Sequence, residues 1–309
     1  MDGLERRTAR IFAADGKSVV LAFDHGMGGA RHAGMKNPGQ TLRDCISAGS
    51  DAVLITPGLA RQFGDDLTSV GVVINLDIAS GNDEAAVREA MLLGVEMGKF
   101  IFYPGSEAVP DSQARTRHMI VTAHDQGLPV MVEPIPVSFE AKHAHTPENI
   151  GTGAKIACEI GADVVKMQYS GDPDSFAEIM ETLYRPVVIL GGPNRGNLRG
   201  VLEDIRNAMN AGARGTTIGR NIWEADAPER VIAALAAIVH EDATVDQAVR
   251  HLEPSLAVAE HRESQTRHAP DVPKANSPRL RVGCSLSGSR RYPFLARRPQ
   301  SVPRRRVTY

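Results

Sequence analysis

The sequence predicts a single (β/α)8 barrel, because short apolar segments alternate with helical patterns eight times before the chain becomes irregular. Apolar segments without regular polar alternation are typical of parallel strands that are covered on both faces. Eight strand-helix units over about 250 residues fit a closed barrel better than an open, doubly wound sheet. No GxGxxG segment follows the first strand, so a dinucleotide-binding fold has little support.

The predicted strands are short and rich in β-branched residues, and they are expected at 18–23, 52–55, 72–77, 99–103, 129–133, 163–167, 186–190 and 215–219. Helical patterns, several ending in a glycine where a C-terminal cap belongs, follow at 37–50, 84–98, 112–127, 147–161, 173–184, 197–212 and 227–241. We expect a first helix at 4–13 to close the bottom of the barrel, and a short last helix at 241–253.

Charge is distributed unevenly along the chain. Residues 260–309 contain eleven Arg and one Lys against three acidic residues, a balance of +9, so residues 1–259 carry −11 of the total of −2. We predict a barrel domain at 1–255 and a disordered, Pro/Arg/Ser-rich tail at 256–309. The tail could be an electrostatic arm or a dispensable extension, and we favour the second. The acidic body does not offer a uniform nucleic-acid surface, so no nucleic-acid partner is expected.

The sequence gives no indication of a membrane, metal or cofactor site. No segment approaches the ~20 apolar residues of a membrane span, and the N-terminus lacks the apolar core of a signal peptide, so we expect a cytoplasmic protein. Cys45, Cys158 and Cys284 are far apart and have no zinc-ligand spacing. We therefore expect no metal, no cofactor and no disulfide framework.

Lys166 is the most informative residue, because it is a lone charge in the apolar strand predicted at 163–167. Burial disfavours the charged ammonium and makes the neutral amine available as a nucleophile toward a carbonyl, which points to a Schiff base. The alternative is that the side chain reaches the strand end and pairs there with an acid. The strand alone does not decide between the two.

Reacting groups of a barrel enzyme lie at the C-terminal ends of its strands. Asp24 could pair with Lys166 and transfer protons, or it could only accept backbone hydrogen bonds in a turn. His25 could bind a substrate hydroxyl or be structural. The other polar residues at strand ends are Asp77, Glu133, Gln168, Tyr169 and Ser170.

The loops after the last two strands indicate a phosphate site. They contain Gly191 and Gly192, and Gly219 and Arg220. Glycine turns let backbone N–H groups approach an anion, and a guanidinium adds charge. Barrel enzymes frequently bind a substrate phosphate in this position. Each loop by itself could be an ordinary turn, but their joint placement favours the phosphate.

Four segments together resemble the archaeal-type, DhnA-like class I fructose-bisphosphate aldolase family, which also includes aminodideoxyheptulosonate synthases and an autoinducer-processing thiolase. They are LAFDHG (21–26), ADVVKMQYSGD (162–172), VVILGGPN (187–194) and TIGRNIWE (217–224). The resemblance extends over residues 3–253 and leaves the tail without a counterpart.

The resemblance implies a (β/α)8 barrel, a phosphorylated sugar substrate, no metal, and a Schiff-base lysine at Lys166. It likewise implies a catalytic aspartate at Asp24. Members are often decameric, so a homo-oligomer is expected. The implied phosphate contacts are Gly191, Gly192, Gly219 and Arg220.

The sequence departs from the family at the end of the fifth strand. Members are expected to carry a general-acid Tyr in a YPRG-like segment, whereas VEPIPVSF puts Ile135 at the Tyr position and Val137 at the Arg position. Glu133, or His143 or His145 acting through a water, is the expected substitute for the missing acid.

These observations favour a class I aldolase that cleaves or forms a carbon–carbon bond in a phosphorylated ketose such as fructose 1,6-bisphosphate. An alternative is a transferase of an acyl or three-carbon unit, which the loss of the Tyr favours. A third is a non-catalytic sugar-phosphate-binding barrel. The presence of both Lys166 and Asp24 argues against this third hypothesis, because binding alone requires neither.

Overall fold

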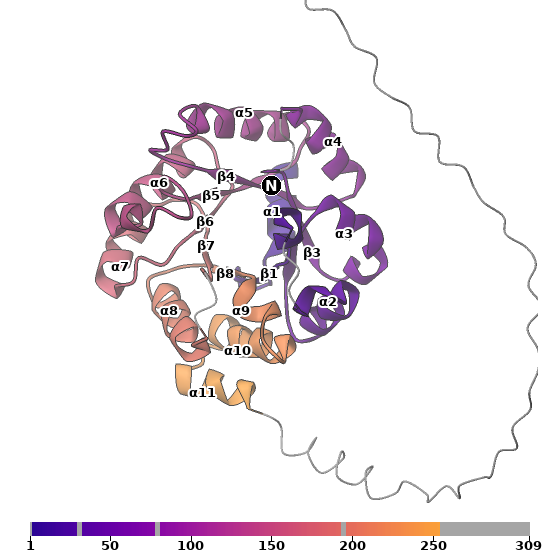
Figure 1. Cartoon of the computed structure of the whole chain (residues 1–309), viewed down its shortest axis with the longest axis vertical. Helices are drawn as coiled ribbons and strands as arrows, with labels where there is room; N and C mark the ends of the chain where they lie inside the picture. Colours follow the sequence, from indigo (N-terminus) through magenta and orange to yellow (C-terminus); the bar gives the residue numbers. More distant parts are fainter. Residues whose placement is uncertain (1, 30–32, 78–80, 193–195, 254–309) are drawn as a thin grey trace, which may run out of the picture. The chain divides into compact units, whose positions relative to one another are not determined.

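The computed structural model describes residues 2–29, 33–77, 81–192 and 196–253. They form a closed barrel of eight parallel strands in sequence order, with β8 hydrogen-bonded to β1 (Figure 1). The predicted fold class is confirmed, and the tail predicted at 256–309 lies outside the described residues. The strands are β1 (Ser18–Ala22), β2 (Ala52–Ile55), β3 (Gly71–Asn75), β4 (Met97–Phe102), β5 (Val130–Pro134), β6 (Val164–Met167), β7 (Val187–Leu190) and β8 (Gly215–Ile218).

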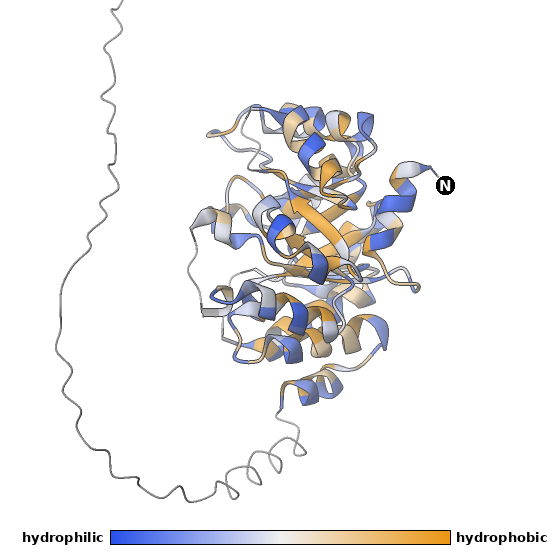
Figure 2. Ribbon diagram, turned by 90° about the vertical axis from the view of Figure 1, so that its right-hand side faces the viewer, coloured by the Kyte–Doolittle hydropathy of each residue, from blue (hydrophilic) through white to orange (hydrophobic). Residues whose placement is uncertain are grey.

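Helices surround the strands, and Figure 2 shows the apolar strands inside and more polar helix surfaces outside. Within the described part of the chain, no helix is long and apolar enough to cross a bilayer. The helices are α1 (Gly3–Thr8), α2 (Pro38–Ser47), α3 (Pro57–Gln62), α4 (Asp83–Leu92), α5 (Ser112–Asp125), α6 (Pro147–Glu159), α7 (Pro173–Glu181), α8 (Leu198–Asn210), α9 (Arg220–Trp223), α10 (Pro228–His240) and α11 (Val245–Val249).

Two helical segments differ from the sequence-based expectation. The helix expected at 84–98 ends at Leu92, because Gly94 adopts a φ of +72° and β4 already begins at Met97. Helix α3 was not expected, since six residues are too few to show a helical period. Its start is nevertheless encoded locally, because the Thr56 hydroxyl accepts a hydrogen bond from the Leu59 N–H and a proline follows as the first helical residue.

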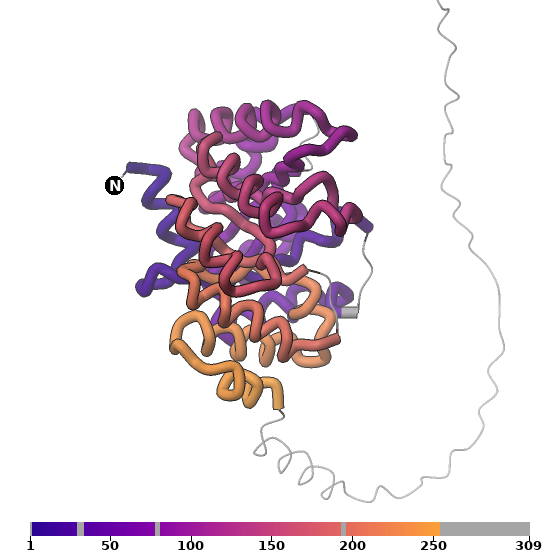
Figure 3. The backbone as a smooth tube through the Cα atoms, turned by 90° about the vertical axis from the view of Figure 1, so that its left-hand side faces the viewer, coloured from indigo at the N-terminus to yellow at the C-terminus, as the bar shows by residue number. Residues whose placement is uncertain are grey.

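The barrel interior has an apolar lower layer that is closed from below by the N-terminal segment. After α1 the chain continues as a 3-10 turn, Ala9–Ile11, whose Ile11 is fully buried. Figure 3 shows this N-terminal segment projecting at one end of the barrel. The helix expected to close the bottom is therefore present, although its last turn is tighter than an α-helix. Ile11 packs in one cluster with Val20, Ala22, Ala52, Leu54, Val73, Met97, Met131, Val164 and Val188.

At the lower end of the barrel, acidic side chains link neighbouring strands two by two. An acidic side chain one residue before β2, β4 and β6 accepts a hydrogen bond from a backbone N–H near the start of the preceding strand. These N–H groups belong to the first two residues of β1, β3 and β5 and are satisfied in this way. The pairs are Asp51 with Val19 (2.7 Å), Glu96 with Val72 (2.9 Å) and Asp163 with Val130 (2.8 Å).

His240, the last residue of α10, joins this lower edge to the N-terminal loop. Its Nε2 lies 3.0 Å from Asp51 Oδ2, and its Nδ1 lies 2.9 Å from Asp15 Oδ2. Hydrogen bonds to Asp51 and Asp15 raise the pKa of His240 from 6.5 to about 9. The protonated imidazole therefore bridges two carboxylates and holds α10 against the start of the barrel.

This bridge predicts a pH-dependent stability. Because the pKa of His240 is higher in the folded protein than in the unfolded chain, its contribution is complete below pH 6.5 and is lost as the pH rises to about 9. Urea unfolding of the full chain at several pH values should show this decline, and His240→Gln should flatten it. His251→Gln, a change at an exposed histidine, should leave the decline intact. A pH profile unchanged by His240→Gln would contradict the assignment.

Candidate active site

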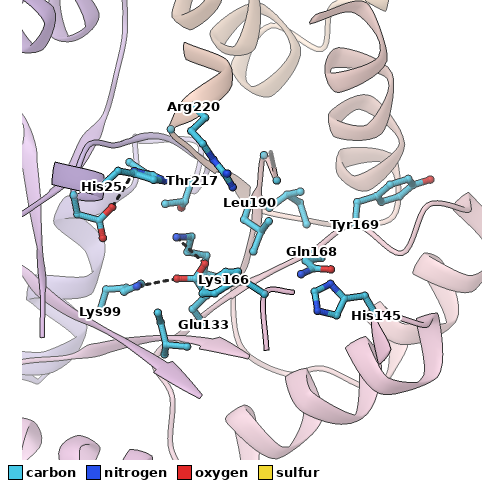
Figure 4. A pocket seen from close by; sticks show the side chains of 18 of the residues that line it. His25, Lys99, Glu133, His145, Lys166, Gln168, Tyr169, Leu190, Thr217 and Arg220 are labelled. Atoms are coloured by element: carbon cyan, nitrogen blue, oxygen red, sulfur yellow. Dashed lines mark ion pairs between the residues drawn. The ribbon is translucent and has the colours of Figure 1, made fainter. Parts of the chain in front are cut away.

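A cavity of about 810 Å³ opens at the C-terminal ends of the strands, above the apolar layer. Side chains alternate along a strand, so the residue two positions after an apolar interior residue also faces the interior. At this second interior position the sequence places charged residues on β4, β5 and β6 and an asparagine on β3. They are Asn75, Lys99, Glu133 and Lys166, and all four line the cavity. Figure 4 shows Lys99, Glu133 and Lys166 among them.

Glu133 lies between two buried lysines. Its Oε1 is 3.0 Å from Nζ of Lys166, and its Oε2 is 2.9 Å from Nζ of Lys99. Lys99 also donates to Oδ2 of Asp77 at 2.7 Å. The exposed fractions are 6% for Lys166, 2% for Lys99 and 4% for Glu133, so water contributes little to their solvation. The result is a buried row of alternating charge, from Asp77 through Lys99 and Glu133 to Lys166.

The row fixes the charge state of its inner members. Burial acts to lower the pKa of Lys99, but Asp77 and Glu133 outweigh it and raise that pKa, so Lys99 remains protonated. Burial likewise acts to raise the pKa of Glu133, but Lys166 and Lys99 lower it, so the carboxylate remains ionised. Glu133 is therefore a proton acceptor in direct contact with the amine of Lys166.

The direct ion pair between Asp24 and Lys166, one of the two roles considered for Asp24, does not form among the described residues. Among the described residues Lys166 pairs with Glu133, whereas Asp24 accepts a hydrogen bond from Nδ2 of Asn75 at 2.5 Å. The reason is strand order, because β5 neighbours β6 while β1 lies between β2 and β8. Burial acts to raise the pKa of Asp24, but the charges of Lys99 and Lys166 outweigh it and lower that pKa. Asp24 is thus an ionised carboxylate in the same cavity.

His25 is held beside Asp24 by an aromatic contact. Its Nδ1 is 3.4 Å from Asp24 Oδ1, and its ring packs edge-on against Trp223 with centroids 5.3 Å apart. Burial lowers the pKa of His25, and the nearby Asp24 offsets this only in part. A neutral imidazole therefore lines the cavity and can exchange a hydrogen bond with a hydroxyl.

The loops after β7 and β8 come together as expected. Gly191, Gly192, Gly219 and Arg220 all line the cavity. A Cβ on Gly219 would come within 2.5 Å of the Ala22 carbonyl oxygen, so only glycine lets this turn lie so close to β1. Nδ2 of Asn221 donates to the Gly191 carbonyl at 2.9 Å and ties the two loops to each other.

Two polar atoms beside these loops have no hydrogen-bond partner among the described residues. Thr217 is 1% exposed, and its hydroxyl forms no hydrogen bond with the described residues. The same holds for Nε of Arg220. Because leaving a buried polar atom unpaired costs about 1–3 kcal/mol, such atoms indicate a place where a polar ligand is bound.

The other strand-end residues are distributed between the cavity and its surroundings. Gln168 and Tyr169 line the cavity, as does His145, whose Nε2 lies 2.8 Å from the Ser138 carbonyl oxygen. His143 is exposed and is not part of the cavity wall. Ser170 hydrogen-bonds to Ser175 at the start of α7. His145 thus remains a candidate for proton transfer, and His143 does not.

The structure describes Ile135 and Val137, which stand where the resemblance places the family Tyr and Arg. Ile135 is fully buried outside the cavity wall, and its N–H donates to the Phe102 carbonyl. Val137 adopts a φ of +62°, which is unusual for a β-branched residue. Of the substitutes considered for the missing acid, Glu133 is the one in contact with Lys166.

Sequence reasoning missed Lys99, Asn75 and Thr217. Of these three, Lys99 could have been recognised from the sequence, because like Lys166 it is a charged residue within an apolar strand. No cluster of three or more His, Cys, Asp or Glu side chains suited to a metal ion occurs in the described part of the chain.

The sequence model of the DeoC/LacD family aldolases matches residues 18–225, which include every residue of the charged row. The chain belongs to the DeoC/LacD aldolase family. The enzyme class and the resemblance drawn from the four segments are thereby confirmed.

The chain is similar to named proteins and solved structures over most of their length. A 2-amino-3,7-dideoxy-D-threo-hept-6-ulosonate synthase of Halobacterium salinarum is 30% identical over 79% of this chain and 95% of its own length. A class 1 fructose-bisphosphate aldolase of Thermoproteus tenax is 31% identical over 78% of this chain and 96% of its own. A solved archaeal fructose-1,6-bisphosphate aldolase, with its catalytic lysine bound to the carbinolamine intermediate, is 30% identical with a TM-score of 0.67, covering 76% of this chain and 99% of that one.

Because Lys99 and Lys166 share the carboxylate of Glu133, we expect them to contribute unequally to the free energy of unfolding of this aldolase. Lys99→Met leaves Asp77 without its ion pair and should reduce the free energy of unfolding by about 3–5 kcal/mol. Lys166→Met should change it by less than about 1 kcal/mol, because Glu133 keeps Lys99. Urea unfolding of both variants measures the difference. Equal losses of unfolding free energy in Lys99→Met and Lys166→Met would contradict these unequal contributions.

Proposed function

We propose that this protein is a Schiff-base aldolase that cleaves or forms a carbon–carbon bond in a phosphorylated ketose, with Lys166 as the nucleophile. The observation that carries the proposal is the contact between Lys166 Nζ and Glu133 Oε1 at 3.0 Å inside the cavity. A buried amine next to an ionised carboxylate has a base that can take its proton. The names of the relatives support a sugar-phosphate substrate of this kind.

The reaction would begin at the amine of Lys166. Glu133 takes a proton from the ammonium, and Nζ attacks the ketone carbon to form a carbinolamine. Glu133 then returns its proton to the hydroxyl of the carbinolamine, so that this hydroxyl leaves as water and Glu133 is ionised again. The product is a protonated imine, which withdraws electrons from the neighbouring carbons. Asp24, ionised in the same cavity, would stabilise this positive charge and take part in moving the proton that leaves as water.

Bond cleavage requires a base for the hydroxyl on the far side of the bond. We assign this role to Glu133, in place of the family Tyr. As Glu133 removes the hydroxyl proton, the carbon–carbon bond breaks, its electron pair moves to the imine to form an enamine, and the aldehyde leaves. Protonation of the enamine and addition of water then release the phosphorylated ketone and restore Lys166. Lys99 would act as a positioning residue that holds Glu133 ionised and correctly placed.

The phosphate would be bound by the loops after β7 and β8. Support comes from the Gly191–Gly192 and Gly219–Arg220 turns and from the unpartnered Nε of Arg220 and hydroxyl of Thr217. His25 would bind a substrate hydroxyl near Lys166.

A transferase is the second candidate, favoured by the buried Ile135 at the position where the family carries its general acid. A cleaving aldolase needs only one substrate, whereas a transferase turns over only with an acceptor, so assays with and without acceptor separate the two. A homo-oligomer and a cytoplasmic location stay predictions.

Covalent trapping tests the nucleophile. Incubation with a ketose phosphate and sodium borohydride should reduce the imine and attach the sugar to Lys166, as peptide mass spectrometry would show. Lys99, which remains protonated, should not be labelled, and Lys166→Met should abolish labelling. An adduct on another lysine, or none with any ketose phosphate of a broad panel, would refute the assignment.

Replacement of one carboxylate oxygen of Glu133 by an amide nitrogen tests whether Glu133 is the catalytic base. Glu133→Gln keeps the shape of the side chain but removes its basicity, so kcat should fall by about 10²–10⁴-fold. Imine trapping at Lys166 should still reach completion, more slowly, because the amine itself is retained. Circular dichroism would verify the fold. A kcat within threefold of the unaltered enzyme would exclude Glu133 as the base.

A further inference from the structure

Asn75, the last residue of β3, is a buried amide whose two ends have different partners. Its Nδ2 donates to Oδ2 of Asp24 at 2.5 Å, and its Oδ1 accepts a hydrogen bond from the N–H of Asp77 at 2.8 Å. A backbone N–H can only donate, so the amide has one orientation and presents its NH2 group to Asp24. The exposed fractions are 2% for Asn75 and 7% for Asp24, so water has little access to this contact.

The contact between Asn75 and Asp24 does not follow from strand pairing. Strands β1 and β3 lie on either side of β2, so the two side chains meet in the barrel interior. Asn75 is also tied to the charged row, because Asp77, whose N–H it accepts, receives the ammonium of Lys99 at 2.7 Å. Asn75 therefore fixes the position of Asp24 relative to the row that contains Lys166.

Asn75 is the one hydrogen-bond donor to the Asp24 carboxylate among the described residues. His25 Nδ1 lies 3.4 Å from Oδ1 of Asp24 but forms no hydrogen bond there. Burial acts to raise the pKa of Asp24, whereas the charges of Lys99 and Lys166 and the hydrogen bond from Asn75 lower it. The charged or titratable groups of the cavity wall nearest to this reaction centre are His25, Asp77, Lys99, Glu133, Lys166 and Arg220.

Asp24 contributes to the proposed function in its ionised form, and the following inference rests on that function. We propose that Asn75 is a positioning residue that orients the Asp24 carboxylate and keeps it ionised while the imine forms on Lys166. The amide occupies one oxygen of Asp24 and leaves the other available to the reacting groups. Without this donor the neutral acid becomes more favourable in the buried site, and a neutral acid does not stabilise a cation.

Imine formation with dihydroxyacetone phosphate tests this role, because no carbon–carbon bond has to break. The adduct on Lys166 is reduced at set times with excess borohydride and measured by mass spectrometry. Asn75→Leu keeps about the same side-chain size but has no donor. Its rate should be about tenfold below that of the unaltered enzyme at pH 7.5, and lower by about a further twofold or more at pH 4.5, because more of Asp24 is then neutral. The half-saturating concentration of dihydroxyacetone phosphate should change by less than about threefold.

Thr116→Val is the matched control for a loss of stability without a role in the site. Thr116 is fully buried in α5 and outside the cavity wall, and its hydroxyl donates to the Ser112 carbonyl at 2.8 Å. Its rate relative to the unaltered enzyme should be the same at both pH values. Asn75→Ala leaves room for a water in place of the amide, so it should show the same pH trend with a smaller loss. It also serves if circular dichroism shows that Asn75→Leu does not fold.

A double-mutant cycle assigns the effect to Asp24. In an Asp24→Asn background, Asn75→Leu should cause no further pH-dependent loss, because the group that it acts on is no longer ionisable. Rates of both Asn75 variants within about twofold of the unaltered enzyme at both pH values, or a pH-dependent loss that persists in the Asp24→Asn background, would overturn the role of Asn75. An adduct on Lys166 of the unaltered enzyme would leave the aldolase function standing in either case, whereas absence of any adduct would refute both.

Discussion

The site depends on one carboxylate that is shared by two buried lysines. Glu133 contacts Lys99 and Lys166 with separate oxygens, and each lysine alone would be costly to bury. Lys99 has a second partner in Asp77, so it is a permanent cation. Among the described residues Lys166 forms an ion pair with Glu133 alone, and Glu133 keeps Lys99 as a partner when Lys166 reacts. Under the proposed function, the same arrangement makes one lysine structural and the other reactive.

The barrel provides the environment that makes this arrangement effective. Its lower half is apolar and is closed by Ile11 from the N-terminal segment, so the charged row has little access to water from below. In such surroundings each ion pair is stronger than at the surface, and each unpaired charge is more costly. At the bottom edge, carboxylates such as Asp51 fasten neighbouring strands, and His240 ties the last barrel helix to them.

The differences that the resemblance implies concern the half of the site that, under the proposed function, handles the released fragment. The segments around Lys166 and the glycine turns resemble the family pattern, whereas Ile135 and Val137 stand where the resemblance implies a Tyr and an Arg. Ile135 is withdrawn into the core, and Glu133, two residues earlier on the same strand, faces the cavity. A proton acceptor at a different position of β5 is consistent with aldolase chemistry on a different preferred substrate.

The sequence by itself determined the eight strands, most of the helices and the choice of Lys166 as a candidate, because periodicity, caps and a lone charge in an apolar strand are local signals. It also located the glycine turns after β7 and β8. The partner of Lys166 was decided only by the tertiary structure, since barrel closure sets which strands are neighbours and places Glu133, not Asp24, beside it. Lys99 is visible in the sequence as a charge, but its role depends on two carboxylates from other strands. Long-range pairing of this kind leaves no periodic trace along the chain.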